Sequence, residues 1–278
     1  MIYTISNSRF QLSASDLGGE LASFREGDYE YIWQRCDIWN GQSPLLFPIV
    51  GRLRDDTYEL NGTSYTMAKH GFARKSLFIL ESHSDSEMTF LLTQREETLA
   101  MYPYTFELRV HYRFLENGFV MEYSVKNTGK DTMYFSMGAH PGFQCCMGDK
   151  IVMDQPETAS AFRLDSNALR GPETLPVLDN STDIVITPTI FSADALIFDG
   201  LQSKGCTLRR ENGRDVHVDF GGAPCLGLWA KPGAPYVCIE PWYGIDDRYN
   251  AGHDFTKKER ICSLEAGQTF HFPVKVTI

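Results

Sequence analysis

Two histidines and one glutamate stand in sequence contexts that suit acid–base chemistry. His70 lies in "AKHGFAR" and His140 in "MGAHPGF", and both are flanked by glycine and aromatic residues instead of strand-like alternation. Glu240 follows the apolar, β-prone run "YVCI". Burying an unpaired carboxylate is costly, so Glu240 needs a partner or a purpose. Histidine and glutamate are common proton-transfer groups in enzymes, which makes these residues candidates for that role.

A proline follows His140 and another follows Glu240. Proline restricts the preceding residue to extended backbone and removes an N–H, so we expect each strand to end or to reach a sheet edge there. Two ionisable side chains would then stand at strand ends, aimed into a cleft. The residues alone leave a second interpretation open, in which His140 is a satisfied core histidine and Glu240 part of a structural salt bridge.

The elements that must position these residues are mostly strands. Period-two alternation of apolar residues dominates the chain, and Asn-Gly pairs at 61–62, 117–118 and 212–213 predict hairpins. Residues 270–278 alternate in the same way, and the best helical signal is a short one at residues 93–103. Residues 163–190 are irregular and contain proline, which predicts a long excursion between strands.

Neither a long linker nor a low-complexity tract divides the 278 residues. We therefore expect a single domain over residues 1–278, with an all-β fold built as a large antiparallel sandwich with few short helices.

The composition excludes several classes of partner. A net charge of -10 would repel nucleic acid and anionic membranes at long range. The first residues show no signal-peptide pattern, and no stretch approaches the roughly 18 apolar residues of a membrane helix. The seven cysteines are scattered without a CxxC pair, which favours free thiols in a reducing cytoplasm and predicts no structural metal site.

Aromatic and basic residues accompany the candidate acid–base groups. Aromatic faces suit the C–H faces of a sugar ring, and arginine, aspartate and asparagine suit its hydroxyls; aromatic residues are also ordinary core residues of a β protein. The residues in question are Trp33, Trp39, Trp229, Trp242, Tyr243, Arg52, Arg54 and Arg74.

Three segments resemble motifs of the aldose 1-epimerases, or galactose mutarotases, and in particular of their LacX-like branch. "FPIVGRLRDDTYELNGTSYTMAKHGFAR" is similar to an arginine motif that precedes a hairpin and a histidine-glycine motif. "GAHPGF" resembles the motif of the catalytic histidine, and "VCIEPWYGIDD" that of the catalytic glutamate. The order and spacing of the motifs match over nearly the whole chain.

The resemblance implies a role for each matching residue. Glu240 would be the general base and His140 the general acid, while Arg52 and His70 would hold sugar hydroxyls. Asp194, in "SADALIFDG", would bind hydroxyls further round the ring.

Some positions leave the site undefined or depart from the family pattern. Asp199 lies close enough to Asp194 to take its place, and His253, Asp246 and Asp247 are further candidates for the cleft. Gly51 replaces the asparagine that the family usually has before the first arginine, and Pro141-Gly142 replaces bulkier residues. Trp242 replaces a residue that is usually polar. We therefore expect Trp242 to bind the sugar and to influence which sugar is preferred.

The resemblance also implies a large β-supersandwich and an isomerase that interconverts the α and β anomers of a free hexose such as galactose or glucose. It implies a small-molecule sugar substrate and no metal or organic cofactor. With the cysteine pattern, we expect a cytoplasmic protein that is a monomer or homodimer.

Three alternatives remain at the level of sequence. A sugar-phosphate epimerase would need a cationic pocket, for which Arg52, Arg54, Arg74 and Lys69 are candidates. A non-catalytic carbohydrate-binding or sensing protein would keep the cleft without needing a matched acid and base. A sandwich-fold glycosidase or lyase would cleave an oligosaccharide and release new reducing ends.

Overall fold

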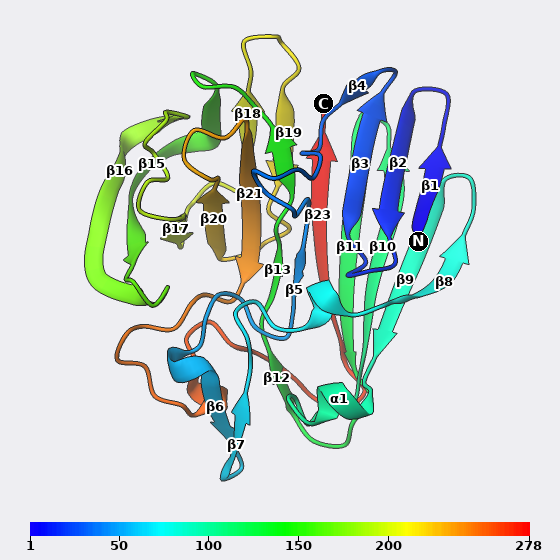
Figure 1. Ribbon diagram of the computed structural model, residues 1–278, viewed down its shortest axis with the longest axis vertical. Helices are drawn as coiled ribbons and strands as arrows, with labels where there is room; N and C mark the ends of the chain where they lie inside the picture. The colour runs from blue at the N-terminus through cyan, green and yellow to red at the C-terminus, as the bar shows by residue number, and fades with distance from the viewer.

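The computed structural model describes residues 1–278 and is built almost entirely of antiparallel strands (Figure 1). Its helical elements are a single α-helix and three 3-10 turns: α1 (Glu96–Leu99), η1 (Arg54–Asp56), η2 (Ala73–Lys75) and η3 (Phe255–Lys257). None of these has the length and apolar character that crossing a membrane requires. The predicted all-β fold and the short helix within residues 93–103 are confirmed.

The strands form one large sheet and three small ones. The large sheet has the order β5 (Leu45–Leu46), β13 (Met137–Ala139), β21 (Tyr236–Tyr243), β20 (Cys225–Trp229), β17 (Leu196–Asp199), β15 (Lys150–Leu164), β18 (Gly205–Arg209), β19 (Val216–Asp219), β23 (Thr269–Thr277), β11 (Gly118–Asn127), β10 (Phe106–Leu115), β9 (Glu87–Thr93), β8 (Ile79–His83). Beside this path, β14 (Gly142–Gln144) pairs with β21, and β16 (Arg170–Val185) pairs with β15. The small sheets are β1 (Ile2–Ser6), β2 (Phe10–Ser15), β3 (Leu21–Glu26) with β4 (Tyr29–Glu30); β12 (Met133–Phe135) with β22 (Cys262–Leu264); and β6 (Thr57–Leu60) with β7 (Thr63–Thr66).

The sheet of β1 to β4 packs face to face on β10 and β11 of the large sheet, as Figure 1 shows. Phe24 of β3 lies 4.5 Å, ring centre to ring centre, from Phe119 of β11, and Phe10 of β2 lies 6.2 Å from Phe114 of β10. Two sheets joined by side chains from their inner faces are the defining feature of a sandwich. A core cluster of 64 buried residues takes members from strands along the whole chain, from Ile5 to Val276.

The three predicted hairpins are present, and Asn212 and Gly213 lie in the loop of residues 210–215 between β18 and β19, as predicted. Asn61 and Gly62 both have positive φ in the two-residue turn between β6 and β7. Between β10 and β11 the turn lies one residue earlier than predicted, because Gly118 already pairs with Leu115. Gly118 instead lets β23 approach, since a Cβ there would stand 2.0 Å from the carbonyl oxygen of Val276.

The prediction of an irregular excursion over residues 163–190 is wrong. Most of this segment is β16, a 16-residue strand that pairs with β15 and forms the edge of the sheet there. Pro172 and Pro176 are compatible with it because an edge strand needs ladder hydrogen bonds on one side only. Register shifts between the two strands explain the missing alternation that made the segment look like a loop.

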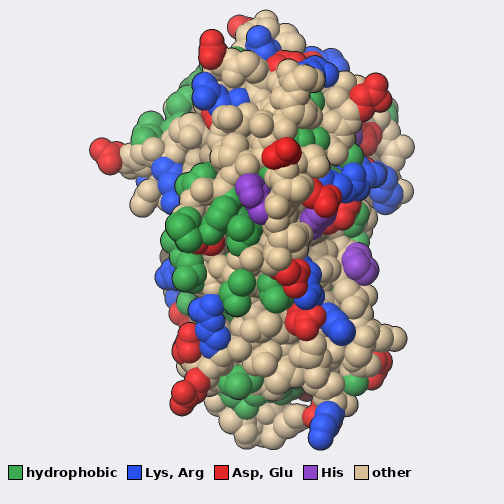
Figure 2. All heavy atoms as spheres, turned by 90° about the vertical axis from the view of Figure 1, so that its right-hand side faces the viewer, with side chains coloured by type: hydrophobic (Ala, Val, Ile, Leu, Met, Phe, Trp, Pro, Cys, Tyr) green, Lys and Arg blue, Asp and Glu red, His purple; other side chains and the backbone are tan.

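Both sheets end on the side of the molecule formed by β1 and β8, which Figure 2 faces. Apolar side chains form small groups there among charged ones (Figure 2). Exposed large apolar residues on or beside these two strands are Met1, Ile2, Leu17, Leu77 and Ile79. Charged neighbours such as the Arg109–Glu81 ion pair, 2.7 Å long, interrupt this edge, as is common for strand edges that stay unpaired.

Candidate active site

Glu240 lies inside β21, opposite a break in the neighbouring strand. On that side β21 pairs first with β13, through Gly138 and Trp242, and then with β14, through Gly142 and Cys238. Both bridges belong to the same antiparallel register. The residues of β21 between them, including Glu240, face the interval that separates β13 from β14.

His140 occupies this interval, and the register places it directly opposite Glu240. The expected end of a strand at proline is confirmed for His140, since β13 stops at Ala139 and Pro141 precedes β14. It is wrong for Glu240, because β21 continues through Pro241, which still pairs with Leu226 of β20. Pro141 thus lies in the interval between β13 and β14, and Pro241 lies in the continuous strand β21 beside that interval.

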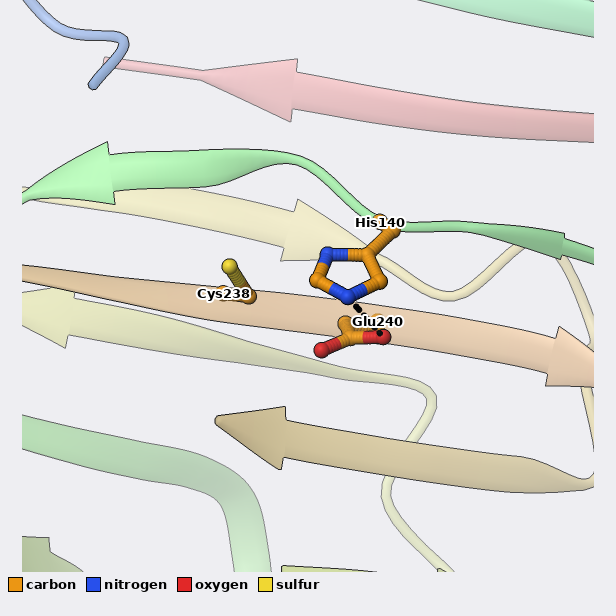
Figure 3. Close-up of side chains that lie close together, drawn as sticks. All are labelled: His140, Cys238 and Glu240. Atoms are coloured by element: carbon orange, nitrogen blue, oxygen red, sulfur yellow. Dashed lines mark ion pairs between the residues drawn. The ribbon is translucent and has the colours of Figure 1, made fainter. Parts of the chain in front are cut away.

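The two side chains meet across the gap (Figure 3). His140 Nε2 lies 3.2 Å from Glu240 Oε2, and the side chains are 11% and 2% exposed. Neither Glu240 Oε2 nor His140 Nδ1 makes a hydrogen bond within the protein. Opposite residues on one face of an antiparallel pair are near neighbours, so the fold brings this histidine and this carboxyl into contact.

Burial shifts both groups toward their uncharged forms. Desolvation raises the pKa of Glu240 well above its usual range, while the Lys69 ammonium opposes the rise and the carboxylates of Asp246 and Asp194 add to it. Desolvation lowers the pKa of His140 to about 3. Both shifts favour glutamic acid beside an uncharged imidazole over an ion pair across the 3.2 Å contact.

The pair opens into a cavity of about 290 Å³. Pockets for small molecules start at about 300 Å³, so this one suits a compact ligand such as a monosaccharide. Its lining consists of Trp39, Pro44, Lys69, His70, Arg74, His140, Leu164, Asp194, Ala195, Ile197, Trp229, Glu240, Trp242 and Asp246.

Three tryptophans form the aromatic part of the lining. Trp39 stacks on the His140 ring at 5.5 Å, and Trp229 meets that ring edge-on at 5.9 Å. The Trp242 indole lies over glycines of both flanking strands, since a Cβ at Gly138 or Gly227 would stand 2.5 Å from its ring. The remaining tryptophan, Trp33, is buried in the core against Tyr236 and does not line the cavity.

His70 lies at the cavity wall with a fixed tautomer. Its backbone has φ 67°, and the Gly51 N–H donates to His70 Nδ1 at 3.1 Å. Because Nδ1 accepts this bond, the proton of the neutral ring is on Nε2. Burial lowers the pKa of His70 well below its usual value, with Lys69 and His140 adding to the effect, so Nε2–H is a neutral donor.

Of the two aspartates near residue 196, Asp194 reaches the cavity. Its side chain forms no ion pair and accepts only the N–H of Ala195, at 2.9 Å. Asp199, at the end of β17, pairs with Arg260 at 2.6 Å and does not line the cavity.

Arg52, expected to hold sugar hydroxyls, does not line the cavity. Its guanidinium binds both carboxylate oxygens of Asp56, at 2.7 and 2.6 Å, and donates to the carbonyl of Asn167 at 3.1 Å. Arg54 is also directed elsewhere, with Nη2 lying 2.6 Å from His253 Nε2. These partners hold both arginine side chains away from the cavity.

Asp246 lines the cavity, although the sequence did not show whether it would reach it. It is 1% exposed, and its Oδ1 accepts the backbone N–H of Arg52 at 2.9 Å. A Cβ at Gly51 would stand 2.1 Å from its carboxyl carbon, so glycine at position 51 makes room for this carboxylate. Asp247 turns away and pairs with Lys258 at 2.6 Å. Adjacent aspartates give no sequence signal for which one faces inward.

Cys238 lies beside the pair, two residues before Glu240 on the same strand (Figure 3). The ligand atoms of His140, Cys238 and Glu240 lie within 4.8 Å of one another, which is close enough to surround a metal ion. Burial raises the pKa of the Cys238 thiol well above its usual value, so a metal would have to displace its proton. This donor set is therefore better suited to holding protons than to a resident metal.

Comparison with known proteins agrees with this architecture. The family model for aldose 1-epimerases matches residues 1–275. Protein LacX of Lactococcus lactis subsp. lactis is 32% identical over 283 residues, with 95% of each chain covered.

Two solved structures extend the similarity to the fold. A galactose mutarotase related enzyme from Lactobacillus acidophilus is 34% identical with a TM-score of 0.93, over 100% of this chain and 97% of that one. A galactose mutarotase-like protein from Lactobacillus casei is 27% identical with a TM-score of 0.94, over 100% and 99%. The chain belongs to the aldose 1-epimerase family, as a LacX-like member, and is an isomerase that acts on carbohydrates.

Proposed function

We propose that this protein is an aldose 1-epimerase that interconverts the α and β anomers of a hexose such as galactose or glucose. The observation that carries the proposal is the 3.2 Å contact between His140 Nε2 and Glu240 Oε2 in the cavity wall. In a pyranose the anomeric hydroxyl oxygen and the ring oxygen O5 are both bonded to C1. Opening the ring requires a proton to leave the first oxygen and a proton to reach the second, so the base and the acid must be near neighbours.

In this mechanism the Glu240 carboxylate takes the proton of the anomeric hydroxyl while the His140 imidazolium protonates O5. The C1–O5 bond breaks, the aldehyde end rotates about C1–C2, and the ring closes on the other face with both proton transfers reversed. Acid–base assistance of this kind contributes about 10²–10⁴-fold to a rate. No oxidant, metal or organic cofactor enters the balance of this reaction.

The pKa shifts of the pair fit these roles. A glutamate whose pKa is raised is a stronger base, and a histidine whose pKa is lowered is a stronger acid once it is protonated. The resting pair, glutamic acid beside neutral imidazole, and the working pair, carboxylate beside imidazolium, hold the same single proton. A sugar hydroxyl that donates to the carboxylate favours the working form.

The rest of the lining supports sugar binding. The faces of Trp39, Trp229 and Trp242 are apolar platforms for the C–H faces of a ring, and His70 Nε2–H and the Asp194 carboxylate are free to bond hydroxyls.

The test follows the optical rotation of freshly dissolved α-D-galactose and α-D-glucose with wild type, Glu240→Gln and His140→Asn. We expect wild type to exceed the spontaneous rate on at least one sugar, and both variants to lose most of this turnover while still binding it. Binding without turnover by the wild type would instead identify a sugar-binding protein, and new reducing ends from an oligosaccharide would identify a glycosidase or lyase.

A further inference from the structure

The indole of Trp39 lies face to face on the imidazole ring of His140. The ring centres are 5.5 Å apart, and the two planes differ by 29°. Trp229 and His70 also approach this imidazole, but both do so edge-on, with angles of 75° and 87° between the planes. Trp39 is thus the aromatic side chain that stacks on His140.

Two glycines and a tyrosine keep the Trp39 indole in this place. Residues 34–38 are exposed, whereas the Trp39 side chain turns inward and is partly buried. A Cβ at Gly41 would stand 2.6 Å from its Cζ2, and one at Gly142 would stand 2.8 Å from its Cζ3, so glycine at both positions leaves room for the ring. Tyr236 stacks on the same indole at 5.1 Å, with the planes 18° apart. The surrounding structure therefore fixes the indole where it meets the histidine.

The proposed reaction needs His140 as a cation, in surroundings that disfavour one. Desolvation is the main cause that lowers the pKa of His140 to about 3, and the charges on Lys69 and Arg74 act in the same direction. The neighbouring His70 is neutral, because burial lowers its pKa. Glu240, at 3.2 Å, is the only carboxyl that pairs with His140. Any further group that attracts positive charge would therefore favour the imidazolium.

The face of an indole is such a group. Tryptophan is the best aromatic partner in cation–π interactions, which act within about 6 Å of the ring centre and grow stronger where water is excluded. The His140 side chain is 11% exposed, and its ring centre lies 5.5 Å from that of Trp39.

We propose that Trp39 is a positioning residue for the reaction, which stabilises the imidazolium form of His140 through the face of its indole. The inference rests on the proposed function and adds a third residue to the acid–base pair.

The effect on the rate follows from the proton balance of the pair. The working form arises when the proton on Glu240 Oε2 passes to His140 Nε2 across 3.2 Å, so no proton enters or leaves the pair. A weaker cation–π contact lowers the population of the imidazolium in full proportion. It also makes the imidazolium a stronger acid, but proton transfer returns only a fraction of that gain to the rate. Weakening the contact should therefore slow turnover.

Fluorinated tryptophans test the contact without removing it. Ring fluorine atoms withdraw electrons from the indole face and change its shape little, so they weaken cation–π attraction stepwise. Tryptophans with an increasing number of fluorine atoms are placed at position 39 by nonsense suppression, and mutarotation of α-D-galactose and α-D-glucose is followed in the polarimeter. We expect kcat to fall at each step, by about ten-fold over the series.

A second measurement separates this role from direct contact with the sugar. Trp39 also lines the cavity, and its contact with the C–H face of a sugar would weaken with fluorine as well. In Glu240→Gln the proton of the working form is not supplied, so calorimetric sugar affinities in this variant report the direct contact alone. We expect fluorine at position 39 to lower kcat with little change in this affinity. A weaker affinity with unchanged kcat would mean that Trp39 only contacts the sugar, and would overturn the proposal.

Trp33 is the matched control for the effect of fluorine itself. It is buried against Tyr236 outside the cavity, and its Nε1–H donates to the Trp39 carbonyl at 3.0 Å, so it reports any effect of fluorine on the loop. The same substitutions at position 33 should change kcat far less than at position 39. Trp39→Leu keeps an apolar side chain without a π face and should lower kcat at least as far as the most fluorinated indole, with Tm measured to check the fold.

Two further results would overturn the proposal: a kcat that stays constant along the fluorine series at position 39, or one that changes equally at position 33. If sugars are turned over in either case, the proposed function stands without a role for Trp39. If wild type turns over no sugar, the proposed function fails, and the ¹⁵N chemical shifts of the His140 ring decide the contact. Their titration should begin at lower pH as fluorine is added at position 39, and superimposable curves would show that the indole does not stabilise the imidazolium.

Discussion

His140 and Glu240 stand opposite each other in one antiparallel register, at the place where the strand that carries the histidine is interrupted. The bridges of Gly138 with Trp242 and of Gly142 with Cys238 lie on either side of the pair. A break in an otherwise continuous ladder thus leaves a 3.2 Å contact between two ionisable groups instead of a backbone bridge.

Because the proposed mechanism needs a proton acceptor and a proton donor at once, we expect the loss of either group to abolish most of the turnover. Glu240→Gln and His140→Asn should each lower kcat by about 10²–10⁴-fold, and the double variant should lose no more than about ten-fold beyond the worse single one. Progress curves in a polarimeter give the rates, and His217→Asn, a half-exposed histidine paired with Asp154, serves as the control. Losses that multiply in the double variant would mean that the residues act independently.

The pH profile of kcat/KM should be bell-shaped, and both of its limbs should reflect the ionisation of His140 and Glu240. As pH falls toward about 3, His140 takes up a second proton, so Glu240 can no longer accept one. As pH rises through the raised pKa of Glu240, the pair loses its only proton and the acid is missing. Rates measured across this range would contradict the scheme if turnover kept rising with hydroxide concentration, as specific base catalysis predicts.

Glu240→Gln should make the folded protein more stable at neutral and alkaline pH. The pKa of Glu240 is raised in the folded state, so the unfolded chain releases this proton at lower pH and the free energy of unfolding falls as pH rises between the two values. Glutamine does not titrate, and each unit of pKa difference is worth about 1.4 kcal/mol.

Urea unfolding of both proteins at several pH values checks this, with Glu116→Gln, an exposed position in the β10–β11 turn, as the control. The stability gained by Glu240→Gln over wild type should grow from about pH 4 upward, where a free glutamate begins to ionise. A gain that is independent of pH would show that the carboxyl ionises as easily in the folded chain as in the unfolded one.

Arg52 and Asp246 should differ in their effect on turnover. Arg52→Met removes a partly exposed ion pair with Asp56, an interaction worth about 0–1 kcal/mol, and takes nothing from the cavity lining. Asp246→Asn keeps the acceptor for the Arg52 N–H but removes a buried charge beside Glu240, so we expect about a ten-fold lower kcat/KM. Steady-state rates that fall further for Arg52→Met would place its side chain at the substrate.

Gly138→Ala should lower activity through Trp242. The added methyl group would stand 2.5 Å from Cδ1 of the indole, which must then shift within the cavity wall. Gly252→Ala is the control, because a Cβ there meets nothing within 4 Å. Combining Gly138→Ala with Trp242→Phe, whose smaller ring relieves the clash, should restore part of the lost kcat/KM; a double variant that recovers nothing would assign the defect to the strand itself.

Much of the fold was predictable because alternation is a local signal. The hairpins of β6–β7, β10–β11 and β18–β19 follow from it. The edge strand β16 could not be recognised, because register shifts and prolines erase the alternation while leaving the pairing intact. Nor could the turn before Gly118, whose glycine serves a close approach of β23.

Residues of the candidate site were predictable where neighbouring residues in the sequence restrict the backbone. They were not predictable where tertiary contacts determine the direction of a side chain. Proline and glycine marked His140, His70 and Glu240 as unusual, and all of them line the cavity. The outward direction of Arg52 depends on Asp56 and on the carbonyl of Asn167. The inward direction of Asp246 depends on the space left by Gly51, a contact between segments far apart in the sequence.

The interrupted strand also governs when the protein becomes active during folding. His140 and Glu240 belong to strands that are distant in the sequence, and pairings of this kind close slowly because long loops must be ordered first. A slip of β21 by one residue would turn Glu240 to the opposite face of the sheet, away from His140. After dilution from denaturant, enzyme activity should therefore return only when β21 has paired with its neighbouring strands. This should occur later than the recovery of the overall β-strand content.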